Sequence, residues 1–248
     1  MTAPAWDRRI ARAEELAGVC SPAAEMLRFY AAIARFQKSV YEKLRSVPES
    51  SAVSDLLPHL PALLSLVKRI GPAPLAQAAN ELAQDPALWE TLLADHRNAE
   101  LEREFFARCL LQPYTELLAS RNNISLGVVQ PVCQFCGDKP VAAVLRGEGE
   151  GAKRSLLCSL CSTEWDFRRL LCPNCGEESE SKLPVYTAHE FPHVRIEACD
   201  SCRTYIKSVD LTKNGLAVPI VDELATISLN LWAEERGYTK LHSNLLGM

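Results

Sequence analysis

The stretch LLCSLCSTEWDFRRLLCPNC, residues 156–175, contains two C-x-x-C motifs that are separated by ten residues. One further motif lies on each side of it, so that four C-x-x-C pairs occur within residues 133–202. The two-residue spacer lets a tight turn, called a knuckle here, present both sulfurs toward one ion. Two knuckles together form a tetrahedral four-sulfur site that suits zinc or iron. The repeated motif therefore predicts metal binding by eight cysteines: Cys133, Cys136, Cys158, Cys161, Cys172, Cys175, Cys199 and Cys202.

The lengths of the spacers predict which knuckles share a metal. Twenty-one residues lie between the first and second knuckles, and twenty-three lie between the third and fourth. Both lengths fit the strand–hairpin–strand connection of a ribbon-type site, slightly extended, whereas the ten residues between the second and third knuckles suit a linker. Site one is accordingly assigned Cys133, Cys136, Cys158 and Cys161, and site two Cys172, Cys175, Cys199 and Cys202. An interleaved arrangement, in which the first knuckle joins the third and the second joins the fourth, stays open at this point.

Other uses of thiol pairs compete with a metal site. Disulfides need an oxidising compartment, but the N-terminal stretch MTAPAWDRRIARAEELAG carries charges throughout and lacks the apolar region of a secretory signal. We therefore predict a cytoplasmic protein, in which thiol pairs serve as metal ligands or redox groups. Thioredoxin-like exchange is an alternative that requires a helix after its motif. Among the four knuckles, only CSTEWDFRRLL, residues 161–171, offers a candidate for such a helix.

The composition bounds the class of protein. A chain of 248 residues with 48% apolar and 23% charged residues is typical of a globular protein with a sizeable core. Its net charge of −4, and basic runs no longer than two residues, argue against a nucleic-acid-binding surface. No segment reaches the roughly 18 apolar residues that span a bilayer, so we expect no membrane insertion.

The first half of the chain reads as helices. In SPAAEMLRFYAAIARFQKSVYEKLR, residues 21–45, a Ser-Pro start precedes a stripe at helical spacing that consists of Met26, Tyr30, Ile33, Val40 and Leu44. Further along, Pro58 and Pro61 limit regular helix to the later part of their segment. We predict an N-terminal all-helical domain over residues 1–125.

After residue 125 the pattern changes to short strand-like runs bounded by glycine, proline and the knuckles. GEGEG, residues 147–151, is expected at a hairpin or loop tip. It is not expected to bind phosphate, since it lacks the Lys-Ser/Thr pair and the following helix of a phosphate loop. DELATISLNLWAEERGY, residues 222–238, predicts one amphipathic C-terminal helix. The predicted fold class is α+β. It places a first rubredoxin-like or zinc-ribbon-like module at residues 126–165, and a second with the C-terminal helix at residues 166–248.

Residues 189–193 read HEFPH, which matches the H-E-x-x-H motif of zinc peptidases. That mechanism requires both histidines one turn apart on a continuous helix, with the glutamate as base. Pro192 disfavours helix at Phe191 and removes a backbone donor, and the flanking runs PVYT and VRIE are strand-like. We therefore predict two surface histidines at a hairpin turn, and no catalytic residue.

The knuckles and their surroundings resemble the formate dehydrogenase accessory protein family, FdhE. The resemblance covers about residues 128–245 and is carried by CQFCGDKPVAAV, LLCSLCSTEWDFRRLLCPNC, RIEACDSCRTYIKSVD and DELATISLNLWAEERGY. It implies that the eight cysteines ligate two metal ions in rubredoxin-like sites, with iron favoured and zinc as the alternative. Five further residues match the family pattern without a role that the match assigns: Glu164, Trp165, Asp200, Tyr205 and Lys207. Of these, we expect Trp165 in the core and Asp200 bonded to amides of its own knuckle.

The resemblance implies a cytoplasmic, chaperone-like accessory protein that assists the maturation of a respiratory formate dehydrogenase by binding its catalytic subunit. It implies no enzymatic activity, and it matches the helical half only in character. Two functions remain as alternatives. One is a zinc-ribbon protein that binds nucleic acid or the transcription machinery, which the acidic composition disfavours. The other is a rubredoxin-like electron carrier.

Overall fold

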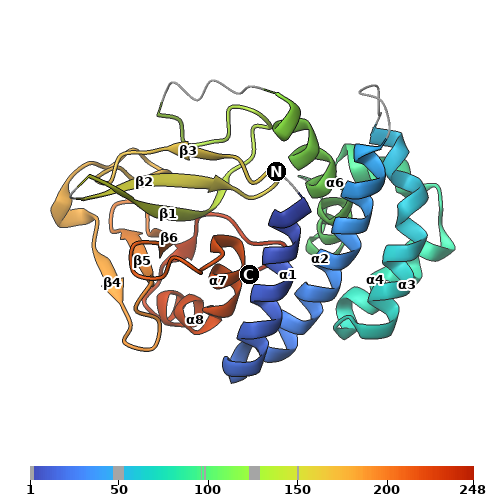
Figure 1. Ribbon diagram of the computed structural model, residues 1–248, viewed down its shortest axis with the longest axis horizontal. Coiled ribbons are helices and arrows are strands. Elements are labelled where there is room, and N and C mark those ends of the chain that lie inside the picture. The colour runs from blue at the N-terminus through green and yellow to red at the C-terminus, as the bar shows by residue number, and fades with distance from the viewer. Residues whose placement is uncertain (1–2, 47–52, 96, 98, 123–128, 150) are drawn as a thin grey trace.

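The computed structural model describes residues 3–46, 53–95, 97, 99–122, 129–149 and 151–248. Its helical half and its sheet lie side by side, and the last two helices lie between them (Figure 1). The chain thus has the predicted α+β fold, with helices first and the cysteine knuckles in the part that contains the sheet. The predicted boundary between residues 125 and 126 falls outside the described residues.

The helical half is built around α2, which contacts α1 on one side and α6 on the other. The helices of this half are α1 (Ala3–Val19), α2 (Ala24–Arg45), α3 (Leu60–Ile70), α4 (Ala73–Gln84), α5 (Leu88–Ala94) and α6 (Leu101–Arg121). The predicted stripe on α2 is confirmed, since Tyr30, Ile33, Val40 and Leu44 are buried and Met26 is half-buried. Among the described residues, no helix combines the length and apolarity that crossing a bilayer requires.

The prolines have the predicted effect on α3. Pro58 lies in a 3-10 segment, Val53–His59, and the regular helix begins only at Leu60, with Pro61 in its first turn. Proline lacks a backbone N–H, and the first helical turn tolerates this because its amides have no partner within the helix. The start of α3 therefore follows from the sequence alone.

The strands of the described residues join into one mixed sheet in the order β3-β2-β1-β6-β5-β4, with β7 beside β6. They are β1 (Pro140–Glu148), β2 (Gly151–Cys158), β3 (Glu164–Asp166), β4 (Val185–Thr187), β5 (Val194–Cys199), β6 (Thr204–Asp210) and β7 (Thr239–Lys240). The hairpin β1–β2 connects the first two knuckles, and the hairpin β4–β5 connects the last two. The predicted unit of knuckle, hairpin and knuckle therefore occurs twice.

The two units share one sheet, because β1 pairs with β6 in parallel. Both strands are buried along most of their length, from Pro140 to Leu145 and from Tyr205 to Asp210. Continuous burial is typical of parallel neighbours, which have a covered surface on each face. The division of this part at residue 165 stays a prediction.

The GEGEG stretch forms the tip of the β1–β2 hairpin, as predicted. Glu148 at the end of β1 pairs with Gly151 at the start of β2. Gly149 between them has a φ of +57°, a left-handed conformation that glycine adopts without a Cβ clash. The described residues of this stretch therefore form a tight turn.

The predicted C-terminal helix is present but divided. It begins earlier than expected, because Pro219 occupies the first turn of α7 (Pro219–Ala225), and it is interrupted at Thr226 before α8 (Ile227–Glu235). A side chain from the sheet bonds the helix next to this interruption. The buried Lys207 Nζ on β6 donates to the carbonyl of Glu223 at 2.5 Å. A carbonyl bonded to a side chain in this way is withdrawn from the regular helical pattern.

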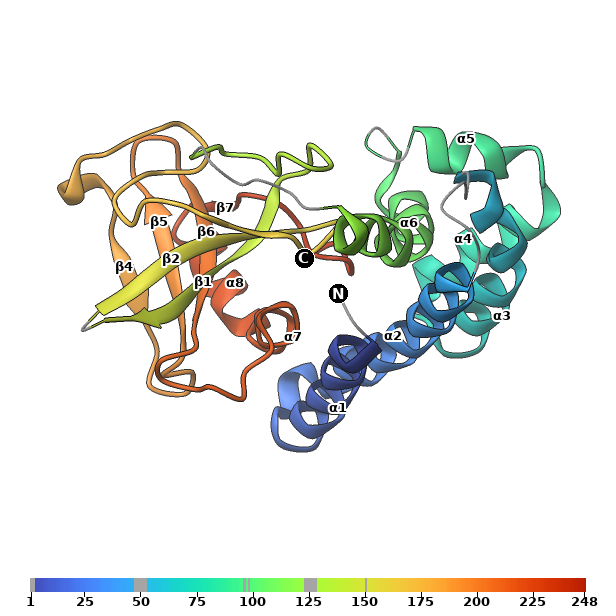
Figure 2. The same ribbon diagram turned by 45° about the horizontal axis from the view of Figure 1, so that its top comes forward.

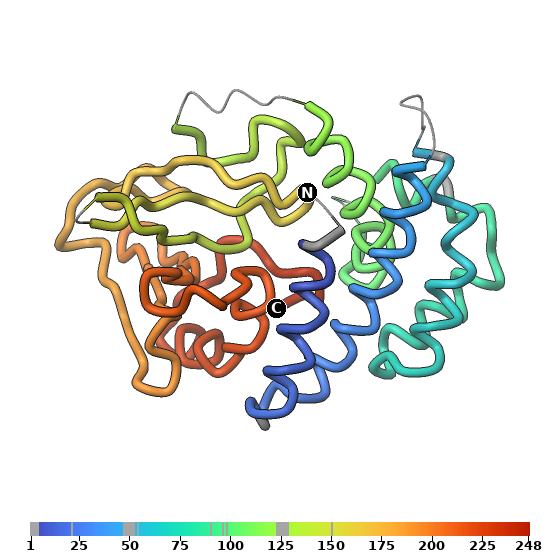
Figure 3. Tube along the Cα trace, in the orientation of Figure 1, coloured from blue at the N-terminus to red at the C-terminus, as the bar shows by residue number. Residues whose placement is uncertain are grey.

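Buried charges gather between α7, β6 and the C-terminal segment, residues 239–248. This segment runs between the two halves (Figure 3). Glu223 Oε1 accepts from Lys207 Nζ at 2.8 Å and from Lys240 Nζ, and Asn244 Nδ2 donates to Oε2 at 2.9 Å. Burial alone would raise the pKa of Glu223, but the two ammonium groups lower it to about 2. Burial lowers the pKa of Lys207 to about 8 against the attraction of Glu223, so the pair is charged at neutral pH.

Two ion pairs attach α1 to the second half and to α6. Arg12 bonds Asp222 twice, with Nη2–Oδ1 at 2.6 Å and Nε–Oδ2 at 3.1 Å. Arg9 Nη1 donates to Glu116 Oε1 at 2.8 Å, and its Nη2 donates to Ser162 Oγ at 3.0 Å. The four charged side chains are buried, and removing one partner of such a pair leaves an uncompensated charge. The pair of Arg12 and Asp222 holds α1 next to α7, as the turned view in Figure 2 shows.

We expect Glu223→Gln to destabilise the chain by about 3–5 kcal/mol at pH 7, because two buried ammonium groups lose their carboxylate. Urea unfolding followed by circular dichroism measures this, with the exposed Glu235→Gln as the matched control. Folding lowers the pKa of Glu223 from 4.5 to about 2, so its ionised form contributes stability above pH 4.5 that is lost as the pH falls. The difference between wild type and variant should shrink in that range. A loss below about 1 kcal/mol at pH 7 would contradict a charged, paired Glu223.

Candidate metal centres

The structure brings the eight cysteines together in two groups of four, and the sulfurs of each group all lie within 4.8 Å of one another. Site one contains Cys133, Cys136, Cys158 and Cys161, and site two contains Cys172, Cys175, Cys199 and Cys202. The first knuckle thus faces the second, and the third faces the fourth, as the spacer lengths predict. The interleaved arrangement is not formed.

The distances between the sulfurs fit a tetrahedral metal ion. The Sγ atoms of Cys136 and Cys158 are 3.3 Å apart in site one, and those of Cys175 and Cys199 are 3.6 Å apart in site two. Four metal–sulfur bonds of about 2.3 Å place their sulfurs about 3.8 Å from one another. These two pairs are within a few tenths of an ångström of this spacing, and the other pairs lie within 4.8 Å, so four-sulfur ligation of zinc or iron fits both groups.

All four knuckles share one backbone feature. The residue after the second cysteine has a positive φ, which is +76° at Gly137, +54° at Ser162, +77° at Gly176 and +56° at Arg203. In the first and third knuckles, the amide of that glycine donates to the carbonyl of the first cysteine at 2.8 and 3.0 Å. Glycine adopts this region freely, whereas other residues do so at a cost of about 1–2 kcal/mol. Ser162 and Arg203 therefore need contacts that hold them there.

Those contacts attach each site to a different part of the molecule. Ser162 Oγ donates to Glu116 Oε1 on α6 at 2.7 Å and accepts from Arg9 on α1. The guanidinium carbon of Arg203 lies 3.9 Å from the centre of the Tyr238 ring, close enough for a cation–π interaction. The second knuckle of site one is thus bonded to the helical half, and that of site two to the segment after α8.

Hydrogen-bond donors surround the sulfurs. Backbone N–H groups of the second and third knuckles donate to Sγ of Cys158 and Cys172 at 3.4–3.5 Å. Cys161 Sγ, as a thiol, donates to the Thr163 hydroxyl at 3.1 Å, and the Thr204 hydroxyl lies 3.0 Å from Cys202 Sγ, where either atom can donate. Donors to sulfur stabilise the thiolate that a metal requires. The repeated pattern C-x-x-C-x-T, at Cys158–Thr163 and Cys199–Thr204, is the signal in the sequence for these threonine contacts.

The two sites differ in exposure. Three cysteines of site one are buried and Cys136 is half-buried, whereas Cys175 of site two is exposed. The helical half also covers site one, because Arg108 Nη2 and Gln112 Nε2 on α6 both donate to the Ser159 carbonyl at 2.9 Å. Site one is therefore an interior centre, and site two lies at the surface.

Three of the five residues that match the family pattern lie in the core. Trp165 is buried, as expected, and its Nε1 donates to the carbonyl of Gln130 at 2.9 Å. Tyr205 and Lys207 are buried neighbours on β6. Burial raises the pKa of Tyr205, so its hydroxyl stays neutral. These three residues pack in and against the sheet, and none of them is described with a charged group bonded to a cysteine sulfur.

The other two matching residues form polar contacts near the surface. Asp200 Oδ1 accepts from the Tyr238 hydroxyl at 2.5 Å and from Arg203 Nη1 at 3.2 Å. Its described bonds therefore go to side chains and not to the knuckle amides that were expected. Glu164 accepts two bonds from Arg146, at 2.7 and 2.9 Å. Asp200 thus helps to position the Arg203 knuckle of site two.

The HEFPH stretch forms the turn between β4 and β5, as predicted. His189 is exposed, whereas His193 is half-buried and its Nε2 lies 2.8 Å from Asp222 Oδ1, a contact that the sequence did not indicate. The two histidines do not share a helix, so the geometry of a zinc peptidase is not formed. His193 instead contributes to the polar cluster around α7.

Comparisons with known proteins agree with this architecture. Two family models match the chain, "FdhE, central domain" at residues 132–169 and "FdhE, C-terminal domain" at residues 170–246. An FdhE homolog of Aquifex aeolicus is 40% identical over 116 residues, which cover 46% of this chain and 41% of that protein. An FdhE homolog of Edwardsiella ictaluri is 33% identical over 163 residues, with coverages of 64% and 53%. The matches thus span about two fifths to one half of the length of these relatives.

A solved structure resembles the chain over almost its whole length. The crystal structure of the FdhE protein from Pseudomonas aeruginosa superposes with a TM-score of 0.80 at 23% identity, and covers 99% of this chain and 96% of that one. At this identity the likeness establishes the fold. It extends over the helical half, which neither family model reaches.

We expect a chelator to remove metal from site two at least about tenfold faster than from site one, because release from a buried site requires local opening. Metal release from the loaded chain, followed with a chromogenic chelator, should show two phases of equal amplitude. Cys175→Ser should eliminate the fast phase, and Cys136→Ser, the matched change in site one, the slow phase. A single phase in the wild type would contradict the difference between the sites.

Proposed function

We propose, from the match of residues 132–246 to the two FdhE family models, that the chain is a cytoplasmic accessory protein in the assembly of a respiratory formate dehydrogenase. In this proposal each four-cysteine site binds one metal ion, and the protein engages the catalytic subunit of that enzyme. The chain itself supplies no catalytic residue. The observation that carries the proposal is the pair of metal-competent cysteine groups within the matched region.

The two sites support different roles in this function. Site one lies between the sheet and α6, and its knuckle residues Ser159 and Ser162 are bonded to the helical half. Metal binding at such a site adds directly to the stability of the fold. Site two exposes Cys175, so it is the centre that a client protein can approach. We therefore propose that metal at site one stabilises the contact between the two halves, and that site two contacts the client protein.

Iron is the metal that we propose, with zinc as the alternative. Four thiolates suit both ions, and the sulfur spacing fits both. Iron would supply a one-electron redox couple, whereas zinc would be structural. The N–H groups that donate to Cys158 and Cys172 would stabilise the thiolates with either ion.

A rubredoxin-like electron carrier is the second candidate function. It is favoured by the exposure of Cys175, because electron transfer requires a partner to come close to the centre. A reversible one-electron couple with a physiological donor, without binding of a formate dehydrogenase subunit, would favour this candidate over the accessory protein.

We expect anaerobic purification from the native host to yield about two iron ions per chain together with the catalytic subunit of a formate dehydrogenase. Metal analysis and mass spectrometry of the co-purifying proteins measure both results. Cys199→Ser should remove one metal ion per chain and the client, because it breaks site two while site one still stabilises the fold. Cys20→Ser, a cysteine outside both sites, is the matched control and should keep metal and client.

Zinc at two ions per chain with no such subunit would contradict the proposal. Retention of the catalytic subunit by Cys199→Ser would separate client binding from site two and contradict the role assigned to that site.

A further inference from the structure

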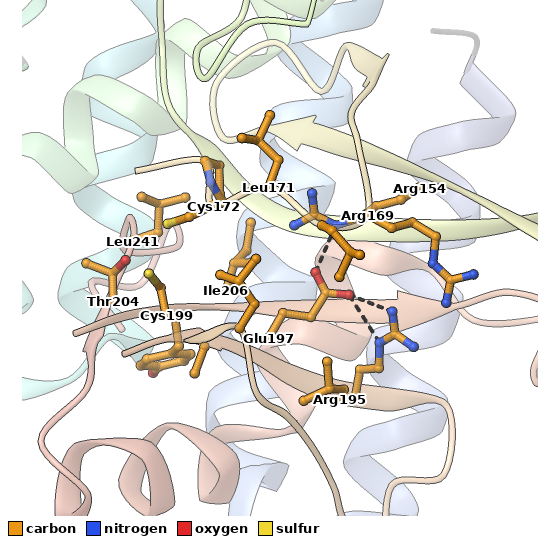
Figure 4. A pocket seen from close by; sticks show the side chains of 16 residues that line it. Arg154, Arg169, Leu171, Cys172, Arg195, Glu197, Cys199, Thr204, Ile206 and Leu241 are labelled. Atoms are coloured by element: carbon orange, nitrogen blue, oxygen red, sulfur yellow. Dashed lines mark hydrogen bonds and ion pairs between the residues drawn. The ribbon is translucent and has the colours of Figure 1, made fainter. Parts of the chain in front are cut away.

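A pocket of about 190 Å³ lies beside site two. Figure 4 shows Cys172 and Cys199 at one end of it, and Arg195 and Glu197 at the other. Ile196, between the last two on β5, faces the opposite side and packs with the core around α8. The volume is below the roughly 300–1,000 Å³ of typical small-molecule sites. The pocket therefore accepts a single side chain or a small ion, and not a cofactor.

The charge of the pocket comes from three guanidinium groups and one carboxylate. Glu197 Oε2 accepts from Arg154 Nε at 2.8 Å, and its Oε1 accepts from Arg195 Nη2 at 2.7 Å. Arg169 is exposed, and within the described part of the chain no hydrogen bond or ion pair engages its side chain. The pocket thus keeps a positive excess in a chain whose net charge is −4. An anionic group is its electrostatic complement.

The thiolates of site two are a competing source of negative charge for these arginines. In Figure 4, however, Arg195 lies at the end of the pocket away from the sulfurs of Cys172 and Cys199. Arg154 and Arg195 are directed to Glu197 instead. The positive charge that Glu197 leaves uncompensated, on Arg169 and Arg195, is therefore available to a group that enters the pocket.

The pocket adjoins the end of the sheet. β4 is the last strand in the order, and the described residues place no strand on its outer side. Its pairing with β5 puts Val185 opposite Glu197 and Thr187 opposite Arg195, so these side chains share one face. Val185 is 51% exposed, and Leu170, which also lines the pocket, is 47% exposed. An unpaired strand edge next to exposed apolar side chains is a template for an added strand.

We propose that an extended peptide segment of the client adds to the edge of β4 and places an acidic side chain in this pocket. The proposal rests on the proposed function only in that the peptide belongs to the client. Backbone hydrogen bonds to β4 would supply affinity, and Val185 and Leu170 would contact apolar side chains of the peptide. Arg169 and Arg195 would select the acidic side chain by ion pairing.

The test uses the metal-loaded full chain and fluorescein-labelled nine-residue peptides of alternating threonine and valine with a central glutamate, glutamine or lysine. Fluorescence anisotropy measures the dissociation constants. We expect the glutamate peptide to bind about tenfold more tightly than the lysine peptide, and Arg169→Glu to weaken its binding by about the same factor. Arg69→Glu makes the same change of charge on α3 and should leave binding unchanged. A glutamate peptide with N-methylated amides should not bind, because it cannot form strand hydrogen bonds.

Equal binding of the three peptides would overturn the proposal. Displacement of the peptide by an equal concentration of acetate would also overturn it, by assigning the pocket to a small free carboxylate. Loss of metal from site two in Arg169→Glu, with unchanged peptide binding, would overturn it by assigning the arginine to the thiolates. In all three cases, co-purification of the formate dehydrogenase subunit with the wild type would leave the proposed function standing. Absence of that subunit would count against the proposed function and not against the peptide site.

Discussion

The parallel pairing of β1 with β6 is the contact on which the rest of the structure depends. It joins two units of knuckle, hairpin and knuckle into one sheet through Ala143–Ser208, Val144–Val209 and Leu145–Asp210. Strands in the middle of such a sheet must be covered, and α7 packs on both of them and on α1. A single line of contacts therefore runs from the sheet through α7 to the helical half. Both cysteine sites are fixed at the ends of the hairpins that this sheet aligns.

Local features of the fold and the site could be predicted from the sequence, since their signals lie within a few tens of residues. The spacers of 21 and 23 residues determined which knuckles meet, because a hairpin of that length returns its ends to one place. The glycines after two of the knuckles, Gly137 and Gly176, indicate their positive φ directly. Ser162 and Arg203 give no such indication, because their conformation depends on partners in α6 and after α8.

The contacts between segments that are distant in the chain could not be predicted, because no pattern in the sequence indicates them. Ala143 and Ser208 are 65 residues apart, and the sequence of neither strand indicates which strand it pairs with. Lys207 lies in a strand where a lysine is ordinarily exposed, and only the packing of α7 supplies Glu223 to pair with it. The division of the last helix at Thr226 follows from that same contact. The pocket beside site two likewise draws Arg154, Arg169 and Arg195 from separate parts of the second half.

The bond between Arg12 and Asp222 has a consequence for the order of events during synthesis. The two residues are 210 positions apart, so at about 5–20 residues per second the aspartate follows the arginine by about 10–40 s. For most of this interval α1 and α2 are complete, while the side of α1 that meets α7 has no partner. We expect the nascent helical half to wait in this open state on the ribosome. The two halves can then join only after α7 has been made, and a chain that stops short of α7 leaves them unjoined.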